Sequence, residues 1–417
     1  MERIRATYFI ETAFPLAETA AAIAGEQSTG TFLKLEGEDD PVVQRQAAIV
    51  ESIRELEDAP QASLPGAATP KNWDGRWRRG EIDLSWPLDN IGPSLPNLMA
   101  TIAGNLFELR QLSGIRLKDV SLPRAFRAAY PGPAFGVAGT RRLAGVDRLP
   151  LIGTIIKPSV GLSPEATAMA VERLVAGGID FIKDDELQAD GPFCPFAERV
   201  TAVMRVINQA ADRQGRKVMF AFNLTGEIDE MRRQHDIVLQ AGGTCVMVSL
   251  NSVGLAGVAA LRRHSALPIH AHRNGWGLYY RAPNLGIDYR VYQTIWRVIG
   301  VDHMHVNGLR NKFAEPGDSS IASARALLTP LAADAPSIAM PVFSSGQWAG
   351  QTVETYQALG SADLIYACGG GIVGHPGGVI AGVESVRAGW EAALAGETLA
   401  AKAARTPALA TALEFFR

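Results

Sequence analysis

The chain has 417 residues, of which 47% are hydrophobic and 20% are charged. That length and balance are ordinary for a globular protein with two domains and a large buried core. The net charge of −3 and the lack of a basic run argue against nucleic acid or a membrane surface as a partner. The three cysteines lack CxxC spacing, and no signal-peptide core or run of 18 apolar residues occurs. We therefore expect a cytoplasmic protein without disulfides or membrane spans.

The first 130 residues predict an α+β domain with antiparallel strands, of the ferredoxin-like kind. Hydrophobic periodicity gives, in chain order, a strand at 4–11, a helix at 16–25, a strand at 29–35, a helix at 42–56, a strand at 84–88 and a helix at 95–107. The Pro- and Gly-rich segment 130–136 then predicts a link to a second domain. The expected domains are therefore 1–130 and 131–417.

From about residue 150, short apolar strands alternate with stretches at helical spacing. The expected strands are 151–157, 181–185, 218–224, 245–250, 268–273, 303–307, 340–345 and 364–369. Eight such repeats favour a closed (β/α)8 TIM barrel as the catalytic domain. An open doubly wound sheet would give the same alternation, but no GxGxxG follows its first strand.

Polar side chains gather at or near the C-terminal ends of these strands, where barrels of this kind build their active sites. They are Lys157, Lys183, Asp185, Glu186, Asn223, Asn251, His270, His272, Arg273, His303, His305, Ser344 and Gly369–Gly371. Four of the histidines form two HxH pairs on consecutive strands. One HxH pair is more often structural, but two that face a candidate metal site favour a functional role.

The run Lys183-Asp184-Asp185-Glu186 ends the second predicted strand. Alternate strand residues share a face, so Lys183 and Asp185 are expected to point the same way, with Glu186 at the strand end. Two carboxylates there predict a site for a hard cation such as Mg²⁺. A neutral lysine can add CO2 and become a carbamate, a further oxygen ligand. In isolation such a run is more often a solvated strand end, but its place on the barrel rim favours a metal site.

The HxH pairs and Lys183 also permit a second interpretation, a zinc site. An HxH pair with a carbamylated lysine also describes the amidohydrolase barrels, which bind zinc-like ions. In those barrels the HxH lies on the first strand and the lysine on the fourth. Here the first strand ends in Ile155-Ile156-Lys157-Pro158 and Lys183 lies on the second, so the order excludes the zinc hydrolase.

Together the motifs resemble the large chain of ribulose-bisphosphate carboxylase, and within it the carboxylase-like (form IV) proteins. The resemblance runs from about residue 4 to about residue 395. The matching segments are, in order, EQSTGT at 26–31, GN at 104–105, GTIIKP at 153–158 with GLS at 161–163, FIKDDE at 181–186, IHAHR at 269–273, DHMH at 302–305 and GGGIVGHP at 369–376.

The resemblance implies roles residue by residue. Lys183 as a CO2-derived carbamate, Asp185 and Glu186 would ligate Mg²⁺. Lys157 would handle protons at the reacting carbon, and Lys312 would lie on a mobile loop over the substrate. The other implied site residues are His272 and His305 on the rim, Arg273 and His305 at one phosphate position, Gly369 and Gly370 at the other, and Ser344 and Gly346 along the pocket.

The resemblance also implies an assembly. Glu26 and Asn105 match residues of the N-terminal domain that enter the active site of the neighbouring subunit. The expected active unit is therefore a homodimer with shared sites, which can associate into a higher oligomer.

The chain departs from the family pattern at several site positions. Ser159 stands where the family has a second lysine, Ile155 replaces a threonine beside the substrate, Phe32 a tryptophan at the phosphate, and Ser345 the first glycine of a phosphate-binding pair. We therefore do not expect this chain to fix CO2 on ribulose bisphosphate.

The resemblance implies a Mg²⁺-dependent enzyme that forms an enediolate from a phosphorylated keto sugar acid. Methionine-salvage enolases of this kind place a lysine where this chain has Asn105, which disfavours an enolase or isomerase acting on a methylthio-pentulose phosphate. The pattern most resembles proteins acting on 3-oxo-isoapionate 4-phosphate. It predicts a carboxy-lyase that decarboxylates that substrate, with a transcarboxylase/hydrolase on the same substrate as the alternative. A non-catalytic scaffold is disfavoured because Lys157, Lys183 and Lys312 are all retained.

Overall fold

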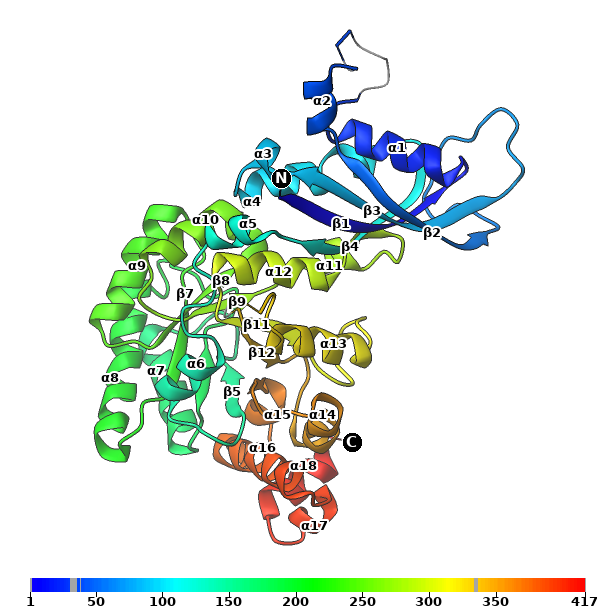
Figure 1. Ribbon diagram of the computed structural model, residues 1–417. Helices are drawn as coiled ribbons and strands as arrows, with labels where there is room; N and C mark the ends of the chain where they lie inside the picture. The colour runs from blue at the N-terminus through cyan, green and yellow to red at the C-terminus, as the bar shows by residue number, and fades with distance from the viewer. Residues whose placement is uncertain (1, 31–35, 38, 334–336, 417) are drawn as a thin grey trace. The chain divides into compact units, whose positions relative to one another are not determined.

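The computed structural model describes residues 2–30, 36–37, 39–333 and 337–416 (Figure 1). It divides into two compact units, one of residues 1–131 with 275–298 and one of 132–274 with 299–417. The strand expected at 29–35 falls mostly outside the described residues, as does Phe32.

The first unit is built on a five-stranded sheet in the order β10-β4-β1-β3-β2. Its strands are β1 (Arg3–Thr12), β2 (Ile49–Ala59), β3 (Trp77–Pro87), β4 (Leu112–Ser121) and β10 (Leu285–Ile287). Strand β1 pairs antiparallel with both β3 and β4, and β10 runs parallel to β4. Alternation fixes the buried face of β1, because Ile4, Ala6, Tyr8 and Ile10 are all at most 2% exposed.

The helices of this unit are short and lie in its connections. They are α1 (Leu16–Glu26), α2 (Pro41–Gln46), α3 (Leu88–Ile91), α4 (Leu95–Ile102), the 3-10 helix η1 (Asn105–Glu108), α5 (Arg124–Ala128), α11 (Gly277–Tyr280) and α12 (Tyr289–Ile299).

Two predicted helices of this unit are wrong in extent. The helix expected at 42–56 stops at Gln46, and the following residues form β2, because they pair antiparallel with β3. The helix expected at 95–107 stops at Ile102. A Cβ at Gly104 would lie 2.3 Å from the Ala100 carbonyl oxygen, so a close backbone approach that only glycine permits separates α4 from η1.

The second unit contains a closed barrel of eight parallel strands in the order β11-β12-β13-β5-β6-β7-β8-β9. They are β5 (Leu151–Ile155), β6 (Phe181–Lys183), β7 (Met219–Asn223), β8 (Cys245–Ser249), β9 (Ile269–His272), β11 (His303–Asn307), β12 (Met340–Phe343) and β13 (Ile365–Ala367). The predicted fold is confirmed: an α+β unit and a (β/α)8 barrel. Each predicted barrel strand is present and ends at most two residues earlier than expected.

Helices lie on the outside of these strands (Figure 1). They are α6 (Gly136–Ala144), α7 (Pro164–Ala176), α8 (Phe196–Gln214), α9 (Ile228–Gln240), α10 (Leu250–His264), α13 (Gly317–Leu328), α14 (Thr352–Leu359), α15 (Gly370–Val373), α16 (Gly378–Ala395), α17 (Leu399–Ala403) and α18 (Pro407–Phe415), with the 3-10 helix η2 at Ala349–Gln351. Among the described residues, no helix combines the length and apolar character needed to cross a membrane.

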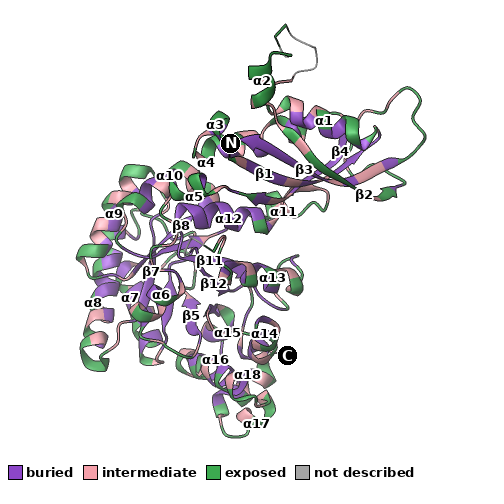
Figure 2. Ribbon diagram, viewed as in Figure 1, coloured by how far each residue is buried: buried purple, intermediate pink, exposed green. Residues whose placement is uncertain are grey.

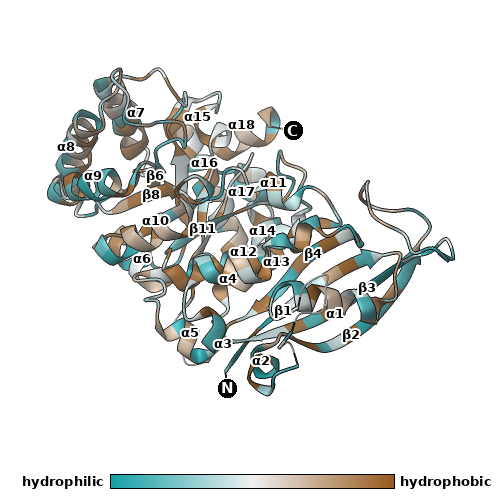
Figure 3. Ribbon diagram, turned by 90° about the horizontal axis from the view of Figure 1, so that it is seen from above, coloured by the Kyte–Doolittle hydropathy of each residue, from teal (hydrophilic) through white to brown (hydrophobic). Residues whose placement is uncertain are grey.

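The barrel interior is a packed apolar core. Phe181, Met219, Met247, Val342 and Ile365 are completely buried there, as the purple strands of Figure 2 illustrate. Figure 3 shows hydrophobic residues, in brown, along the strands. Full burial of each such side chain stabilises the fold by about 1.5–3 kcal/mol. Because this core leaves no room for a substrate, chemistry is confined to the polar C-terminal rim.

Candidate active site

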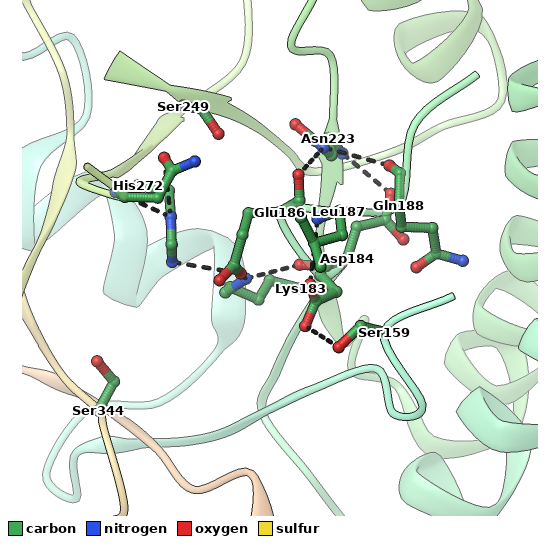
Figure 4. A network of polar contacts seen from close by, with 12 residues as sticks. Ser159, Lys183, Asp184, Glu186, Leu187, Gln188, Asn223, Ser249, His272 and Ser344 are labelled. Atoms are coloured by element: carbon green, nitrogen blue, oxygen red, sulfur yellow. Dashed lines mark hydrogen bonds and ion pairs between the residues drawn. The ribbon is translucent and has the colours of Figure 1, made fainter. Parts of the chain in front are cut away.

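Lys183 is the last residue of β6 and the most buried cation of the rim, with 1% of its side chain exposed. Its Nζ donates to the Asp184 carbonyl oxygen at 2.7 Å and to Glu186 Oε2 at 3.3 Å (Figure 4). Burial lowers the pKa of Lys183, although the nearby carboxylates oppose that shift. A lowered pKa raises the fraction of neutral amine, which is the form that reacts with CO2.

The three carboxylates after Lys183 have different surroundings: Asp184 points into the protein interior, whereas Asp185 and Glu186 lie at the rim. The strand stops at Lys183, so Asp184 and Asp185 lie in the following loop and not on the strand as expected. Asp184 is fully buried, where its Oδ2 accepts from Arg199 Nη2 at 3.3 Å and from the Asn223 N–H at 3.0 Å. Burial raises the pKa of Asp184. Asp184 therefore has a structural role in the interior, and the candidate metal ligands of this run are Asp185 and Glu186.

Asp185 is held by the loop that follows β5. Lys157 Nζ donates to Asp185 Oδ2 at 2.6 Å, and Ser159 Oγ donates to the same oxygen at 3.0 Å. Lys157 also donates to Ser159 Oγ at 2.8 Å, so the three side chains form a closed triangle. Burial alone would raise the pKa of Asp185, but the hydrogen bonds from Lys157 and the Leu187 N–H, with the charge of Lys183, bring it below its usual value. Asp185 is thus a carboxylate at neutral pH.

Glu186 faces His272 across the rim. His272 Nε2 lies 3.4 Å from Glu186 Oε2, and the Asn274 N–H donates to His272 Nδ1, which favours a proton on Nε2 (Figure 4). Burial, followed by the charge of Lys183, lowers the pKa of His272 to about 4. His272 is therefore neutral at neutral pH, with its Nε2 facing the Glu186 carboxylate.

The two HxH pairs divide into an upper and a lower layer. His272 and His305 lie at the rim, whereas His270 and His303 are completely buried. His270 Nε2 lies 2.8 Å from His305 Nε2, and His305 Nδ1 lies 2.9 Å from Ser344 Oγ. Burial lowers the pKa of His270 and His305 well below the ordinary histidine value. The lower layer is therefore part of the core, and the HxH pattern alone could not separate the layers.

Arg273 is already paired with a carboxylate that the sequence analysis missed. Its Nη2 donates to Glu315 Oε2 at 2.6 Å, with both side chains at most 7% exposed. Glu315 also accepts from Asn307 Nδ2 at 2.7 Å and from Ser319 Oγ at 3.0 Å. Nothing in the sequence marks Glu315 beyond its position three residues after Lys312 in the same loop.

The loop of Lys312 is tied to the end of β12. The Lys312 N–H donates to the Ser345 carbonyl oxygen at 3.0 Å, and its Nζ lies 5.2 Å from the centre of the Phe313 ring. Ser345 has φ +69°, in the left-handed region that favours glycine, and Ser345 Oγ donates to Asn307 Oδ1 at 2.7 Å. Gly346 follows with φ +92°. A side-chain hydrogen bond thus supports the serine that replaces the family's glycine.

The glycines expected at the second phosphate position lie at the start of α15. Gly369 precedes the first residue of that helix, Gly370. A Cβ at Gly369 would meet only Ile155 Cδ1, at 3.7 Å, and one at Gly370 would meet nothing within 4 Å. Space beside this backbone is therefore open to a ligand group.

Glu26 and Asn105 belong to the other unit. Glu26 ends α1 and Asn105 begins η1. A Cβ at Gly104 would lie 3.5 Å from Gln27 Nε2, so the segments that carry the two residues are adjacent although 79 positions separate them. Their catalytic role stays a prediction.

Another cluster in the barrel unit has metal-ligand residue types: His235, Asp236 and His264. Asp236 Oδ1 lies 2.9 Å from His235 Nδ1 and 2.7 Å from His264 Nε2. The Ala266 N–H donates to His235 Nε2, which places the ring proton on Nδ1, toward Asp236. The carboxylate is thus satisfied by two hydrogen bonds, and the cluster is explained as a link between α9 and α10.

Comparison with known proteins agrees with the motifs. The family model "Ribulose bisphosphate carboxylase large chain, N-terminal domain" matches residues 4–126, and the model of the catalytic domain matches 136–416. A protein of Xanthobacter autotrophicus described as 3-oxo-isoapionate-4-phosphate transcarboxylase/hydrolase is 61% identical over 416 residues, across all of both chains. A Rhizobium rhizogenes protein described as 3-oxo-isoapionate-4-phosphate decarboxylase is 47% identical, over 99% of this chain and 98% of that one.

Solved structures give the same result. A rubisco-like protein from Burkholderia fungorum matches with a TM-score of 0.93 and 47% identity over the whole of both chains. The octameric ribulose-1,5-bisphosphate carboxylase/oxygenase of Pyrococcus horikoshii matches with a TM-score of 0.87 and 30% identity, over 99% of this chain and 94% of that one. The resemblance predicted from the motifs is confirmed, and the chain belongs to the ribulose-bisphosphate carboxylase large-chain family.

Proposed function

We propose that the protein is an enzyme acting on 3-oxo-isoapionate 4-phosphate, which it converts as a transcarboxylase/hydrolase. The observation that carries this proposal is the 61% identity, over the full length of both chains, with the relative of that name. Decarboxylation, which the motifs predicted, has the same substrate and the same first step. It stays the second candidate because relatives at 47% and 46% identity are described as decarboxylases.

The rim residues fit a bound Mg²⁺. Asp185 and Glu186 offer carboxylate oxygens, and Lys183, buried and with a lowered pKa, is suited to carry a CO2-derived carbamate. The resulting set of oxygen ligands has the hard character that Mg²⁺ prefers. When bound, the ion would supply Lewis-acid polarisation of the substrate's ketone oxygen.

The first step breaks the bond between the carboxylate carbon and its neighbour. The electron pair of that bond moves onto the adjacent ketone, so CO2 forms and an enolate remains. Lys157 is placed to serve the next proton transfer. An ammonium has three N–H donors, and Asp185 and Ser159 occupy two of them, which leaves one for the substrate.

The fate of the CO2 separates the two candidates. A decarboxylase lets CO2 leave and protonates the enolate carbon. A transcarboxylase/hydrolase bonds the CO2 to the former ketone carbon of the enediolate, and the carbon that lost the carboxylate becomes the new ketone. Water adds to this ketone, the bond between the two carbons breaks, and the released carbanion takes a proton, which gives two acids. We assign Lys312 the role of closing over the carboxylate, since retention of CO2 requires a covered site.

The phosphate and the carboxylate of the substrate would be held at two anion positions whose residues already have fixed places. Arg273 and His305 form one position, with Ser344 bonded to His305, and the Gly369 and Gly370 backbone forms the other. Gly346, beside the Lys312 loop, would line the pocket. In this proposal Glu315 is a positioning residue, since it orients Arg273 without contacting the substrate.

We further propose a homodimer in which Glu26 and Asn105 complete the partner's site, with Mg²⁺ and the carbamate on Lys183 as cofactors. Related enzymes of this family from Pyrococcus horikoshii and Hyperthermus butylicus are described as octameric and dimeric. Such assemblies keep a two-fold interface as their building block.

Labelled substrate tests the reaction. With ¹³C at the carboxylate and H2¹⁸O as solvent, we expect the ¹³C in an acid product and one ¹⁸O in a newly formed carboxylate. Release of the label as ¹³CO2 would assign the decarboxylase instead. Failure to convert this substrate, together with turnover of a methylthio-pentulose phosphate, would overturn both and indicate an enolase or isomerase.

A further inference from the structure

The amino-terminal end of the barrel carries a hollow that the proposed reaction does not use. It has a volume of about 420 Å³ and is lined by residues that precede β5, β6 and β7, together with Arg387 of α16. Parallel strands all point the same way, so this hollow lies at the opposite end of the barrel from Lys183 and the rim. Three of its lining residues are arginines: Arg148, Arg216 and Arg387.

A single buried carboxylate anchors two of these arginines. Asp180 is 1% exposed, and its Oδ1 accepts from Arg216 Nη1 at 2.5 Å. Its Oδ2 accepts from Arg387 Nη2 at 3.1 Å and from the Ile152 N–H at 2.9 Å. Two guanidinium groups therefore share one negative charge.

The same two arginines are held by backbone carbonyls. Arg387 Nη2 donates to the Gly178 carbonyl oxygen at 2.7 Å, and Arg216 Nη2 donates to that of Ile179 at 3.3 Å. These bonds fix the planes of both groups, and about a quarter of each side chain stays exposed to the hollow. A structural role in closing the barrel end explains why Arg216 and Arg387 have fixed positions.

That structural role does not explain Arg148. Its side chain is exposed and lines the hollow, yet it makes no hydrogen bond or ion pair with any described residue. The hollow has two acidic side chains: Asp180, which already binds both Arg216 and Arg387, and the exposed Asp147. Three arginines against two carboxylates leave an excess of one positive charge around a concave surface.

We propose that this hollow is a binding site for a small oxyanion of the phosphate type. Guanidinium groups present paired N–H donors in a planar fork that matches phosphate oxygens, and fixed groups lose little conformational entropy on binding. The volume is that of a small-molecule site and accepts a phosphate with a short carbon chain. Arg148 supplies the free donors, and Arg216 and Arg387 supply the oriented positive field.

Calorimetry with inorganic phosphate at low ionic strength tests the proposal. The titrated protein carries Arg273→Gln together with Glu315→Gln, which weakens the phosphate position of the proposed active site, leaves no buried charge without a partner, and leaves the hollow intact. We expect binding to persist in this protein. Adding Arg148→Glu should raise the dissociation constant at least tenfold, because the change removes a charged donor and reverses its charge.

The matched control is Arg142→Glu, an exposed arginine of α6 outside the hollow that gives the same change in net charge. It should alter the dissociation constant less than twofold. Circular dichroism will show whether each variant is folded, and the exposure of Arg148 makes misfolding unexpected. Absence of phosphate binding in the protein with Arg273→Gln and Glu315→Gln, or equal effects of the two charge reversals, would overturn the proposal. Neither result depends on which reaction the rim performs.

Discussion

Replacing Glu315 by alanine removes the carboxylate that holds Arg273 and the Lys312 loop together. Arg273 would be left with a buried charge, since its side chain is 7% exposed and that of Glu315 is 3% exposed. Removing one partner of a buried ion pair costs about 3–5 kcal/mol. Asn307 and Ser319 would also lose the hydrogen bonds that they donate to Glu315. We therefore expect a loss of unfolding free energy in this range, and a higher KM because Arg273 is no longer oriented.

Urea denaturation followed by circular dichroism measures the loss of stability, and steady-state kinetics measures KM. Trypsin gives an independent readout, because cleavage after Lys312 should accelerate once the loop is released. Glu354→Ala is the matched control, because Glu354 pairs with Arg310 of the same loop but both side chains are at least half exposed. An exposed pair of that kind contributes only about 0–1 kcal/mol. Equal stability and equal trypsin sensitivity in the two variants would refute the positioning role of Glu315.

Three further outcomes follow from the same structure. Lys183→Ala should abolish turnover and its dependence on CO2 and chelators while circular dichroism stays native, and activity at the wild-type level would contradict the carbamate. Mixing inactive Lys183→Ala and Asn105→Ala subunits should restore up to about a quarter of wild-type activity, since half of randomly formed dimers are hybrids with one intact site; no recovery despite proven exchange would contradict shared sites. Burial lowers the pKa of His303 to about 3 in the folded protein, against about 6.5 in the unfolded chain. Above pH 6.5 the histidine is neutral in both states and costs no stability. As the pH falls below 6.5, the unfolded chain binds a proton that the folded protein does not, so the folded state loses stability. His303 should therefore lower the unfolding free energy by up to ~1.4 kcal/mol per pH unit between pH 6.5 and 4.5. If the His303→Gln variant shows the same slope of unfolding free energy against pH, His303 is not the cause.

The barrel strands could be predicted because each one is marked by the sequence of its own short segment. Each strand is a short apolar run bounded by polar or glycine residues, and the run predicts a strand whatever lies elsewhere in the chain. Strand β2 was not predictable in this way, because its residues become a strand only through pairing with β3. Most of its side chains stay exposed, so no alternation of buried residues marks it. A charged segment of this kind also suits a helix, which is the structure that the sequence analysis assigned.

The same distinction holds for the candidate site: residues close together in the sequence could be predicted, and residues that only the fold brings together could not. Lys183, Asp185 and Glu186 follow one another in the chain, and a single motif identified them together. Arg273 and Glu315 are 42 residues apart and meet only because β9 and β11 are neighbours in the barrel. The depth of a side chain is also hidden from the sequence. His270 and His272 belong to one motif, yet one lies in the core and the other at the rim.

The cations of the rim support a substrate with one phosphate. Arg273 is neutralised by Glu315, and Lys157 by Asp185. Among the described rim residues, Lys312 is thus the cation without a carboxylate partner. A bisphosphate would bring two dianions to this rim, and the second lysine that the family places at position 159 would help to balance them. Here Ser159 takes that position and hydrogen-bonds to both Lys157 and Asp185, and the rim carries one positive charge fewer than it would with a lysine there. The exchange of lysine for serine therefore suits a monophosphate acid better than a sugar bisphosphate.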